Sequence, residues 1–332
     1  MRFELADLGA PNCRVARLGR DGVKSSPTMR RRNAAALALS IAITFAACDA
    51  RSTINRQAPR PILRMSGNAN IVSALHSLPQ FSVQTTDIGD SEKRLVALQQ
   101  SSIDLAVAVA DVTYMAFNGQ LPDRSRPLDK VRGIALLHSA AVHLLVGPAT
   151  NPSRGFRGMR VVLGNPVGEN AAFGERLMDS MGIAKAEIQG EFLPRDAAVE
   201  KLLKRDVDTL IVTGRLPQKP VVRALLGGAR LLDIDGPEID RLRMYYPLLR
   251  RMLIPRGTYP AQDEPVHTIG LDLLLVCRAD LDKNLVYELT RAYFEETPEN
   301  IRRQTDPQRA PAVVIPLHPG AARYYREREV SR

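Results

Sequence analysis

From Pro61 onward, short apolar runs alternate along the chain with segments in which apolar residues recur at helical spacing. Phe173, Leu177, Met178 and Met181 lie on one face of such a helix. Strands that alternate with helices are typical of an α/β domain with a mostly parallel sheet and flanking helices. The apolar runs predict strands at 62–65, 81–85, 105–109, 134–137, 142–146, 161–163, 210–213, 231–234 and 269–276.

Two turn-rich passages interrupt this alternation, at 147–152 (GPATNP) and at 254–260 (IPRGTYP). If both are crossings between domains, the first lobe is discontinuous. The predicted organisation is then lobe I at 62–147 plus 261–330, lobe II at 148–255 and a hinge crossing at 256–260. Two lobes joined in this way form a cleft, which is where small ligands usually bind and around which hinged closure occurs. No internal repeat is visible.

The N-terminal region carries an export signal. The basic start 29–32 (MRRR) precedes an uncharged apolar stretch at 34–45, which the string FAAC at 45–48 ends. This pattern predicts a signal peptide at 29–47, within a leader at 1–47, and a polar tether at 48–61. The apolar stretch is shorter than the roughly 20 residues that a membrane span needs. Because small residues precede Cys48, the site resembles a bacterial lipobox, although Phe45 stands where leucine is usual.

We therefore expect Cys48 to be lipidated and the protein to be periplasmic, anchored by lipid to a bacterial membrane. The alternative is cleavage near Ala47 by ordinary signal peptidase, without a lipid. The stretch 1–28 carries no usable pattern, and Met29 is an alternative start.

The charge and the composition argue against a nucleic-acid partner. The net charge is +10, but the first 47 residues hold 8 of the 46 basic and 3 of the 36 acidic residues, so half of the excess lies in the leader. The remaining basic pairs are dispersed, as solvated surface charges usually are. Only 5% of the residues are aromatic and none is tryptophan, which disfavours base stacking.

No constellation for catalysis or metal binding stands out. The cysteines show no metal spacing, and Cys277 ends an apolar run as a buried thiol would. The histidines are scattered and form no HxxxH or HxH pair. We expect no enzyme activity, no metal and no cofactor. The histidines stand at His76, His138, His143, His267 and His318.

Four strings resemble one family. The stretch 98–119 (LQQSSIDLAVAVADVTYMAFNG) is similar to a helix–turn–strand segment that leads into DVAYxAxxG, and 254–266 (IPRGTYPAQDEPV) is similar to IPAGTYPGQDEDV. The strings VYELT at 286–290 and PLHPGAARYY at 316–325 match two further family motifs, VYxLT and PLHPGAxRYY. The chain thus resembles the TAXI family of solute-binding subunits of TRAP (tripartite ATP-independent periplasmic) transporters.

The resemblance implies a two-lobed, type II periplasmic-binding-protein-like fold. Such a protein would present a small carboxylate or amino acid to the TRAP permease membrane subunits, with no cofactor. Two ligand-facing loops depart from the family: 65–71 (MSGNANI) lacks the usual glycine and tyrosine residues, and 166–170 (PVGEN) has Glu169 in place of hydroxyl groups. The family's usual ligand therefore does not transfer. The alternative function is a non-transport lipoprotein of the same fold that acts as a sensor or interaction partner.

Polar residues at the ends of predicted strands are the candidate ligand contacts, because open α/β sheets bind ligands there. For most of them, helix capping or turn formation is the competing interpretation. Arg215 follows the strand 210–213 and offers a bidentate clamp for a carboxylate; its alternative is a surface arginine on a loop. The candidates are Ser66, Asn68, Gly89, Asp90, Ser91, Asp111, Tyr114, Gly168, Glu169, Asn170 and Arg215.

Overall fold

The computed structural model of the chain describes residues 60–121, 125–164 and 169–330, without the side chains of Arg154 and of 169–172. The predicted leader, the signal peptide and Cys48 lie outside these residues. Residues 58–332 belong to one compact unit. In the described part of the chain, no helix is long and apolar enough to cross a membrane.

One mixed sheet runs through the described residues, in the order β2-β1-β3-β10-β4-β7-β5-β6, with β8 paired to β4 and β9 paired to β10. The strands are β1 Ile62–Ser66, β2 Ser82–Thr85, β3 Leu105–Val109, β4 Val131–Val146, β5 Arg160–Val162, β6 Gln189–Glu191, β7 Thr209–Gly214, β8 Arg230–Leu232, β9 Arg250–Ile254 and β10 Val266–Arg278.

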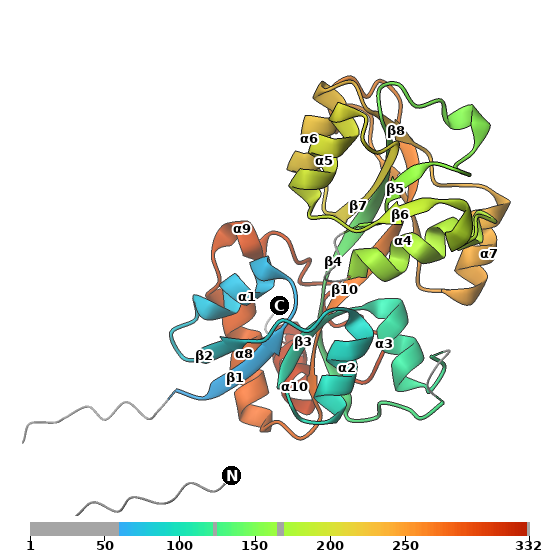
Figure 1. Ribbon diagram of the computed structural model, residues 1–332. Coiled ribbons are helices and arrows are strands. Elements are labelled where there is room, and N and C mark those ends of the chain that lie inside the picture. Colours follow the sequence, from blue (N-terminus) through green and yellow to red (C-terminus); the bar gives the residue numbers. More distant parts are fainter. Residues whose placement is uncertain (1–59, 122–124, 165–168, 331–332) are drawn as a thin grey trace, which may run out of the picture. The chain divides into compact units, whose positions relative to one another are not determined.

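Helices flank this sheet in two groups, which define two lobes (Figure 1). In lobe I, helices α1–α3 and α8–α10 surround β1–β3, and in lobe II, helices α4–α7 surround β5–β8. The α/β class and the two-lobed architecture are thereby confirmed. The helices are α1 Ala69–His76, α2 Ser91–Gln99, α3 Ala110–Phe117, α4 Glu169–Ser180, α5 Arg195–Lys204, α6 Lys219–Leu226, α7 Pro237–Tyr245, α8 Lys283–Glu295, α9 Glu299–Arg302 and α10 Pro319–Val330.

The outer strands of each lobe are parallel, as the alternating pattern predicts. Strand β1 pairs in parallel with β2 and β3, and β5 pairs in parallel with β6 and β7. Between these groups, the long strands β4 and β10 run antiparallel to each other and to their neighbours β7 and β3. Each lobe therefore consists of a parallel outer part attached to an antiparallel central pair.

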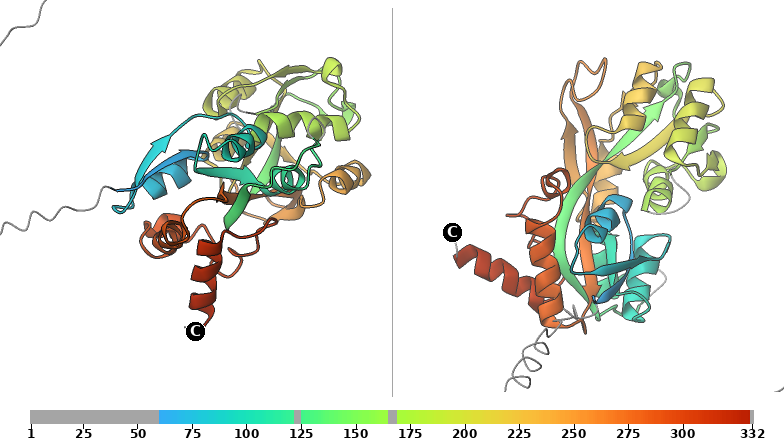
Figure 2. Two further views of the ribbon diagram at one scale, coloured as in Figure 1. Left: turned by 90° about the horizontal axis from the view of Figure 1, so that it is seen from below. Right: turned by 90° about the vertical axis from the view of Figure 1, so that its left-hand side faces the viewer.

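Strands β4 and β10 run side by side through both lobes (Figures 1 and 2). The beginning of β10 pairs with β9 in lobe II, and its end pairs with β3 in lobe I. The stretch 256–260 lies in the connection between β9 and β10. The division at 62–147, 148–255, 256–260 and 261–330 stays a prediction.

The sequence analysis was wrong about β4, which it split into strands at 134–137 and 142–146. His138 and Ser139 interrupt the apolar pattern, but they pair with Leu273 and Asp272 of β10, so the ladder continues through them. Strand β9 was missed because it begins with Arg250 and is mostly exposed.

Two clusters of buried side chains stabilise the fold. The larger contains Leu63, Leu105 and Leu274 from lobe I and the central strands, and it extends to helices of both lobes. The smaller lies in lobe II between the sheet and helices α5 and α6, and it includes Leu202 and Tyr259. Truncating one of these fully buried leucines to alanine typically destabilises a protein by about 2–5 kcal/mol.

Candidate functional site

A cleft of about 660 Å³ is lined by elements of both lobes. Lobe I contributes the turn after β1 and the end of β3, and lobe II contributes the beginning of α5 and the turn after β7. The central strands β4 and β10 add further lining side chains. The polar lining residues are Asn68, Asn70, Asp87, Arg94, His138, Arg195, Thr213, Arg215, Gln218 and Gln304.

The turn after β1 approaches the cleft through a glycine. Gly67 has a φ of +151°, and a Cβ atom there would lie 2.7 Å from Cβ of Val107 and 2.9 Å from its backbone nitrogen. Only glycine combines this backbone conformation with so close an approach. Asn68 then caps α1 by accepting a hydrogen bond from Asn70 N–H at 2.9 Å. Both interpretations of Asn68 therefore hold, because it caps the helix and also lines the cleft.

Ser66 and Gly89 have structural partners, and neither residue lines the cleft. Ser66 is 2% exposed, and its Oγ accepts a hydrogen bond from Ile88 N–H at 3.1 Å. The Gly89 carbonyl accepts from Arg94 Nη2 at 2.5 Å.

A second, smaller cavity of about 140 Å³ lies against Asp90, Ser91 and Asp111 from lobe I and against residues of α4 and α7 from lobe II. Asp90 caps α2 by accepting from Lys93 N–H at 2.9 Å. The Ser91 hydroxyl accepts from Val109 N–H at 2.8 Å, which fixes the end of β3. The structure thus brings these three predicted residues together, beside the main cleft rather than in it.

Asp111 lies in the first turn of α3 and is 3% exposed. Its Oδ1 accepts from Leu248 N–H of lobe II at 2.8 Å, so the side chain joins the two lobes. Its Oδ2 is buried without a hydrogen-bond partner among the described residues. Burial raises the pKa of Asp111 to about 6; the bond from Leu248 opposes this rise and the charge of Asp272 adds to it. Tyr114, one turn later, is half-buried and lines neither cavity.

Arg215 and Arg195 place positive charge in the main cleft. Arg215 follows β7, and among the described residues its guanidinium has neither a carboxylate nor a hydrogen-bond partner. Arg195 begins α5, and its Nη2 donates to the Thr213 carbonyl at 3.3 Å. The side chain of Arg195 is exposed and that of Arg215 is half-buried, and the protein around the guanidinium groups lowers the pKa of both arginines by partial desolvation. Such guanidinium groups are suited to an anion.

The sequence analysis missed Arg195. A basic residue in the first turn of a helix opposes the helix dipole. That unfavourable placement was the signal in the sequence that could have marked Arg195 as a functional residue.

His138 was also missed, because a lone histidine inside an apolar strand is usually a core residue. It lies in β4 and lines the cleft, and its Nδ1 is buried without a partner among the described residues. Burial and the charge of Arg215 lower the pKa of His138 to about 4, against the smaller opposing effect of Asp272. His138 is therefore a neutral hydrogen-bonding group near Arg215 at neutral pH.

Three predicted residues cannot be placed in the site. Gly168 lies outside the described residues. Glu169 and Asn170 begin α4, but their side chains are not described. Their role as ligand contacts stays a prediction.

Comparison with known proteins gives a family and several distant structures. Residues 69–328 match the model of the NMT1-like family. The alkanesulfonate-binding protein SsuA from Xanthomonas axonopodis pv. citri, bound to MOPS, is 13% identical with a TM-score of 0.36, over 75% of this chain and 85% of its own. PhnD1 from Prochlorococcus marinus, in complex with methylphosphonate, is 12% identical with a TM-score of 0.40, over 70% and 82%. The OxyR2 regulatory domain from Vibrio vulnificus is 10% identical with a TM-score of 0.42, over 71% and 95%. These values carry no conclusion about the ligand.

Proposed function

We propose that this chain, which belongs to the NMT1-like family, is a solute-binding protein that captures a small anionic solute in the main cleft and delivers it to membrane transport subunits. The observation that carries the proposal is the pair Arg195 and Arg215, which line the cleft without a carboxylate partner among the described residues. Removing a charge from bulk water is costly unless an opposite charge compensates it. An anion between the lobes would provide that compensation for both arginines.

The rest of the described lining favours the same sign of ligand. Arg94 is 7% exposed, and its guanidinium donates to the carbonyls of Ile88 at 2.8 Å and Val107 at 3.0 Å. It therefore adds a fixed positive charge to the wall of lobe I. Asp87 is the acidic residue among the described lining. Three arginines against one carboxylate favour a carboxylate, sulfonate or phosphonate over a cation.

In its finer form, the proposal is that the protein is a TAXI-type subunit of a TRAP transporter. The ligand would be a small carboxylate or amino acid, and the partners would be the TRAP permease subunits. The four motif strings between 98 and 325 support this assignment. The protein would be periplasmic and held to the membrane through lipid on Cys48.

Calorimetric titration tests the capture of anions. The panel contains glutarate, L-glutamate, methanesulfonate and phosphate. Arg215→Ala and Arg195→Ala should each weaken the best ligand by about 1.5–3 kcal/mol, as for the loss of a hydrogen bond to a charged group. This corresponds to roughly ten- to a hundredfold in Kd. Arg241→Ala is the control, because Arg241 is exposed on α7 and pairs with Glu238 outside the cleft.

Two outcomes would refute the proposal. In one, no anion of the panel binds. In the other, Arg241→Ala weakens binding as much as Arg215→Ala does.

Metabolic labelling with radioactive palmitate tests the lipid anchor. The wild-type protein should incorporate the label, because Cys48 follows a basic and apolar signal. Cys48→Ser should lose it, whereas Cys277→Ser, which removes a buried thiol far from the signal in sequence, is expected to keep it. Equal labelling of Cys48→Ser and wild type would contradict the anchor without affecting the proposal for the cleft.

A further inference from the structure

The turn that carries Arg215 is attached to a buried pair of side chains, one from the central strand β4 and one from the connection between β9 and β10. This turn, residues 214–218, follows β7 and lines the cleft along its whole length. The backbone N–H of Gln218 donates to Oη of Tyr259 at 3.0 Å. Tyr259 comes from the connection between β9 and β10, so a residue distant in sequence contacts the base of the turn.

Tyr259 is itself fixed by His143 of β4. Its Oη lies 2.7 Å from Nε2 of His143, and Nδ1 of His143 lies 3.1 Å from the Val212 carbonyl. A carbonyl only accepts, so Nδ1 carries the proton and Nε2 accepts from the tyrosine hydroxyl. The hydroxyl therefore donates to His143 and accepts from Gln218 N–H.

Both side chains stay neutral, because the pair is sealed from solvent. His143 is 0% exposed and Tyr259 is 3% exposed. Burial lowers the pKa of His143 to about 4, despite the bond to Val212, and raises the pKa of Tyr259 to about 12, despite the bond from Gln218. A fully bonded and neutral buried pair has a defined geometry, whereas leaving any of these polar atoms unpaired would be costly.

Within the turn, Gln218 contacts the backbone on both sides of the Arg215 side chain. The Gln218 side chain folds back so that its Nε2 donates to the Arg215 carbonyl. It packs against Gly214, where a Cβ atom would lie 2.5 Å from Cδ of Gln218. The position of Gln218 therefore sets the path of the backbone that bears Arg215.

The motif around Tyr259 shapes the loop that presents it. Gly257 has a φ of +73°, and its N–H donates to the Gln262 carbonyl at 3.0 Å. The side chain of Gln262 accepts from Tyr259 N–H at 3.2 Å and donates to the Ile254 carbonyl at 3.2 Å. The Gln262 side chain and Gly257 thus hold the loop that presents Tyr259.

We infer that Tyr259 and His143 are positioning residues for the solute site, which hold the turn 214–218 so that Arg215 faces the anion. The inference rests on the proposed function, since it concerns the same cleft. Neither residue lines the main cleft, so neither is a ligand contact.

The test compares Tyr259→Phe with Tyr325→Phe. The first keeps the ring and removes both hydrogen bonds of the hydroxyl. The second removes one buried hydrogen bond, from Tyr325 to the Ile134 carbonyl at 2.9 Å in lobe I, away from the cleft. Amide hydrogen exchange at Gln218 and titration with glutarate are measured for both variants and for wild type.

Tyr259→Phe should accelerate exchange at Gln218 by about tenfold and weaken glutarate binding by about tenfold, as for the loss of one or two hydrogen bonds. Tyr325→Phe should lower the melting temperature but change neither quantity. Unchanged exchange at Gln218 in Tyr259→Phe, or an equal loss of affinity in both variants, would overturn the inference. A wild-type protein that binds neither glutarate nor the rest of the panel overturns the proposed function instead, while the exchange at Gln218 still decides whether Tyr259 holds the turn.

Discussion

Lobes I and II use the same arrangement to fix the beginning of their parallel strands. In lobe I, Asp104 directly precedes β3 and accepts from Arg64 of β1 through the backbone N–H at 2.8 Å, Nε at 3.0 Å and Nη2 at 2.8 Å. In lobe II, Asp208 directly precedes β7 and accepts from Arg160 of β5 through the same three groups at 2.9, 3.0 and 2.8 Å. In both lobes, an arginine of one strand binds the carboxylate of the aspartate that directly precedes the neighbouring strand.

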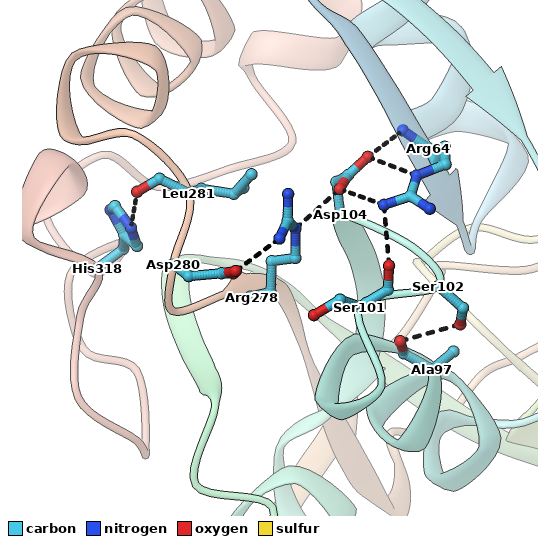
Figure 3. A network of polar contacts seen from close by, with 9 residues as sticks. All are labelled: Arg64, Ala97, Ser101, Ser102, Asp104, Arg278, Asp280, Leu281 and His318. Carbon is cyan, nitrogen blue, oxygen red and sulfur yellow. Dashed lines mark hydrogen bonds and ion pairs between the residues drawn. The ribbon is translucent and has the colours of Figure 1, made fainter.

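The two arrangements differ in burial and in connection. The Asp104 side chain is 5% exposed and also accepts from Arg278 Nε at 2.9 Å, so it joins the end of β10 to β1 and β3 (Figure 3). The Asp208 side chain is 27% exposed, and Arg160 is its described ion-pair partner. Removing one partner from a buried ion pair costs more than removing one from a partly exposed pair, so lobe I should be more sensitive than lobe II to the loss of its carboxylate.

At the other end of these strands, the lobes differ in chemistry. Strand β3 leads to Asp111, whereas β7 leads to Arg215 at the corresponding position. The first residue of the preceding helix is Ser91 in lobe I and Arg195 in lobe II. Each contacts the end of its strand, at Val109 N–H and at the Thr213 carbonyl respectively. The scaffolds correspond, while lobe I supplies a buried carboxyl and lobe II supplies the exposed Arg195 and the half-buried Arg215.

The largest expected effect is the difference between Asp104→Asn and Asp208→Asn. Asp104→Asn removes a buried carboxylate that binds two partly exposed arginines, and it should lower the free energy of unfolding by about 3–5 kcal/mol. Asp208→Asn should lower it by about 1 kcal/mol, because solvent screens the half-exposed pair. Urea denaturation of both variants beside wild type measures the difference.

Equal losses in the two variants would show that neither Arg278 nor the burial of Asp104 increases the contribution of the carboxylate to the free energy of unfolding. A third variant, Arg278→Gln, separates these two factors. It should destabilise the protein by less than Asp104→Asn does, because Arg64 keeps its three bonds to Asp104.

The sequence predicted the fold best where burial is uniform. The strand predicted at 105–109 coincides with β3, because every residue of that strand is buried and apolar. The exposed strand β9 has no such pattern and was missed. The corresponding carboxylates Asp104 and Asp208 gave no visible repeat, because single residues at equivalent positions are too sparse to form a periodic signal.

The residues of the site that the sequence predicted are ones that closely follow strands in the chain. Asn68 and Arg215 follow strands, and both line the main cleft. Arg195 and His138 gain their importance from the other elements that surround the cleft, which local sequence does not encode. Tyr259 was associated with a motif, but its contact with Gln218 joins two segments far apart in the chain.

A smaller effect is expected from the buried carboxyl of lobe I, through the pH dependence of stability. The pKa of Asp111 is about 6 in the folded protein, against 3.8 for an unperturbed aspartate. Between these values, the folded chain holds a proton that the unfolded chain releases, so this group stabilises the fold below about pH 4 and loses that contribution as the pH rises through about 6. Each unit of difference in pKa corresponds to about 1.4 kcal/mol, so the loss in the free energy of unfolding amounts to about 2–3 kcal/mol.

The measurement is the free energy of unfolding of wild type minus that of Asp111→Asn, from about pH 4 to about pH 7. The difference should become less favourable to wild type as the pH rises, because asparagine does not titrate, while Asp272, Asp90 and the other acids occur in both proteins. Asp208→Asn is the matched control: the hydrogen bond from Arg160 lowers the pKa of Asp208 despite burial, so its difference should stay flat above about pH 5. A flat difference for Asp111→Asn as well would mean that the Asp111 carboxyl ionises normally. The contrast between the acid of lobe I and the arginines of lobe II would then hold for geometry but not for energetics.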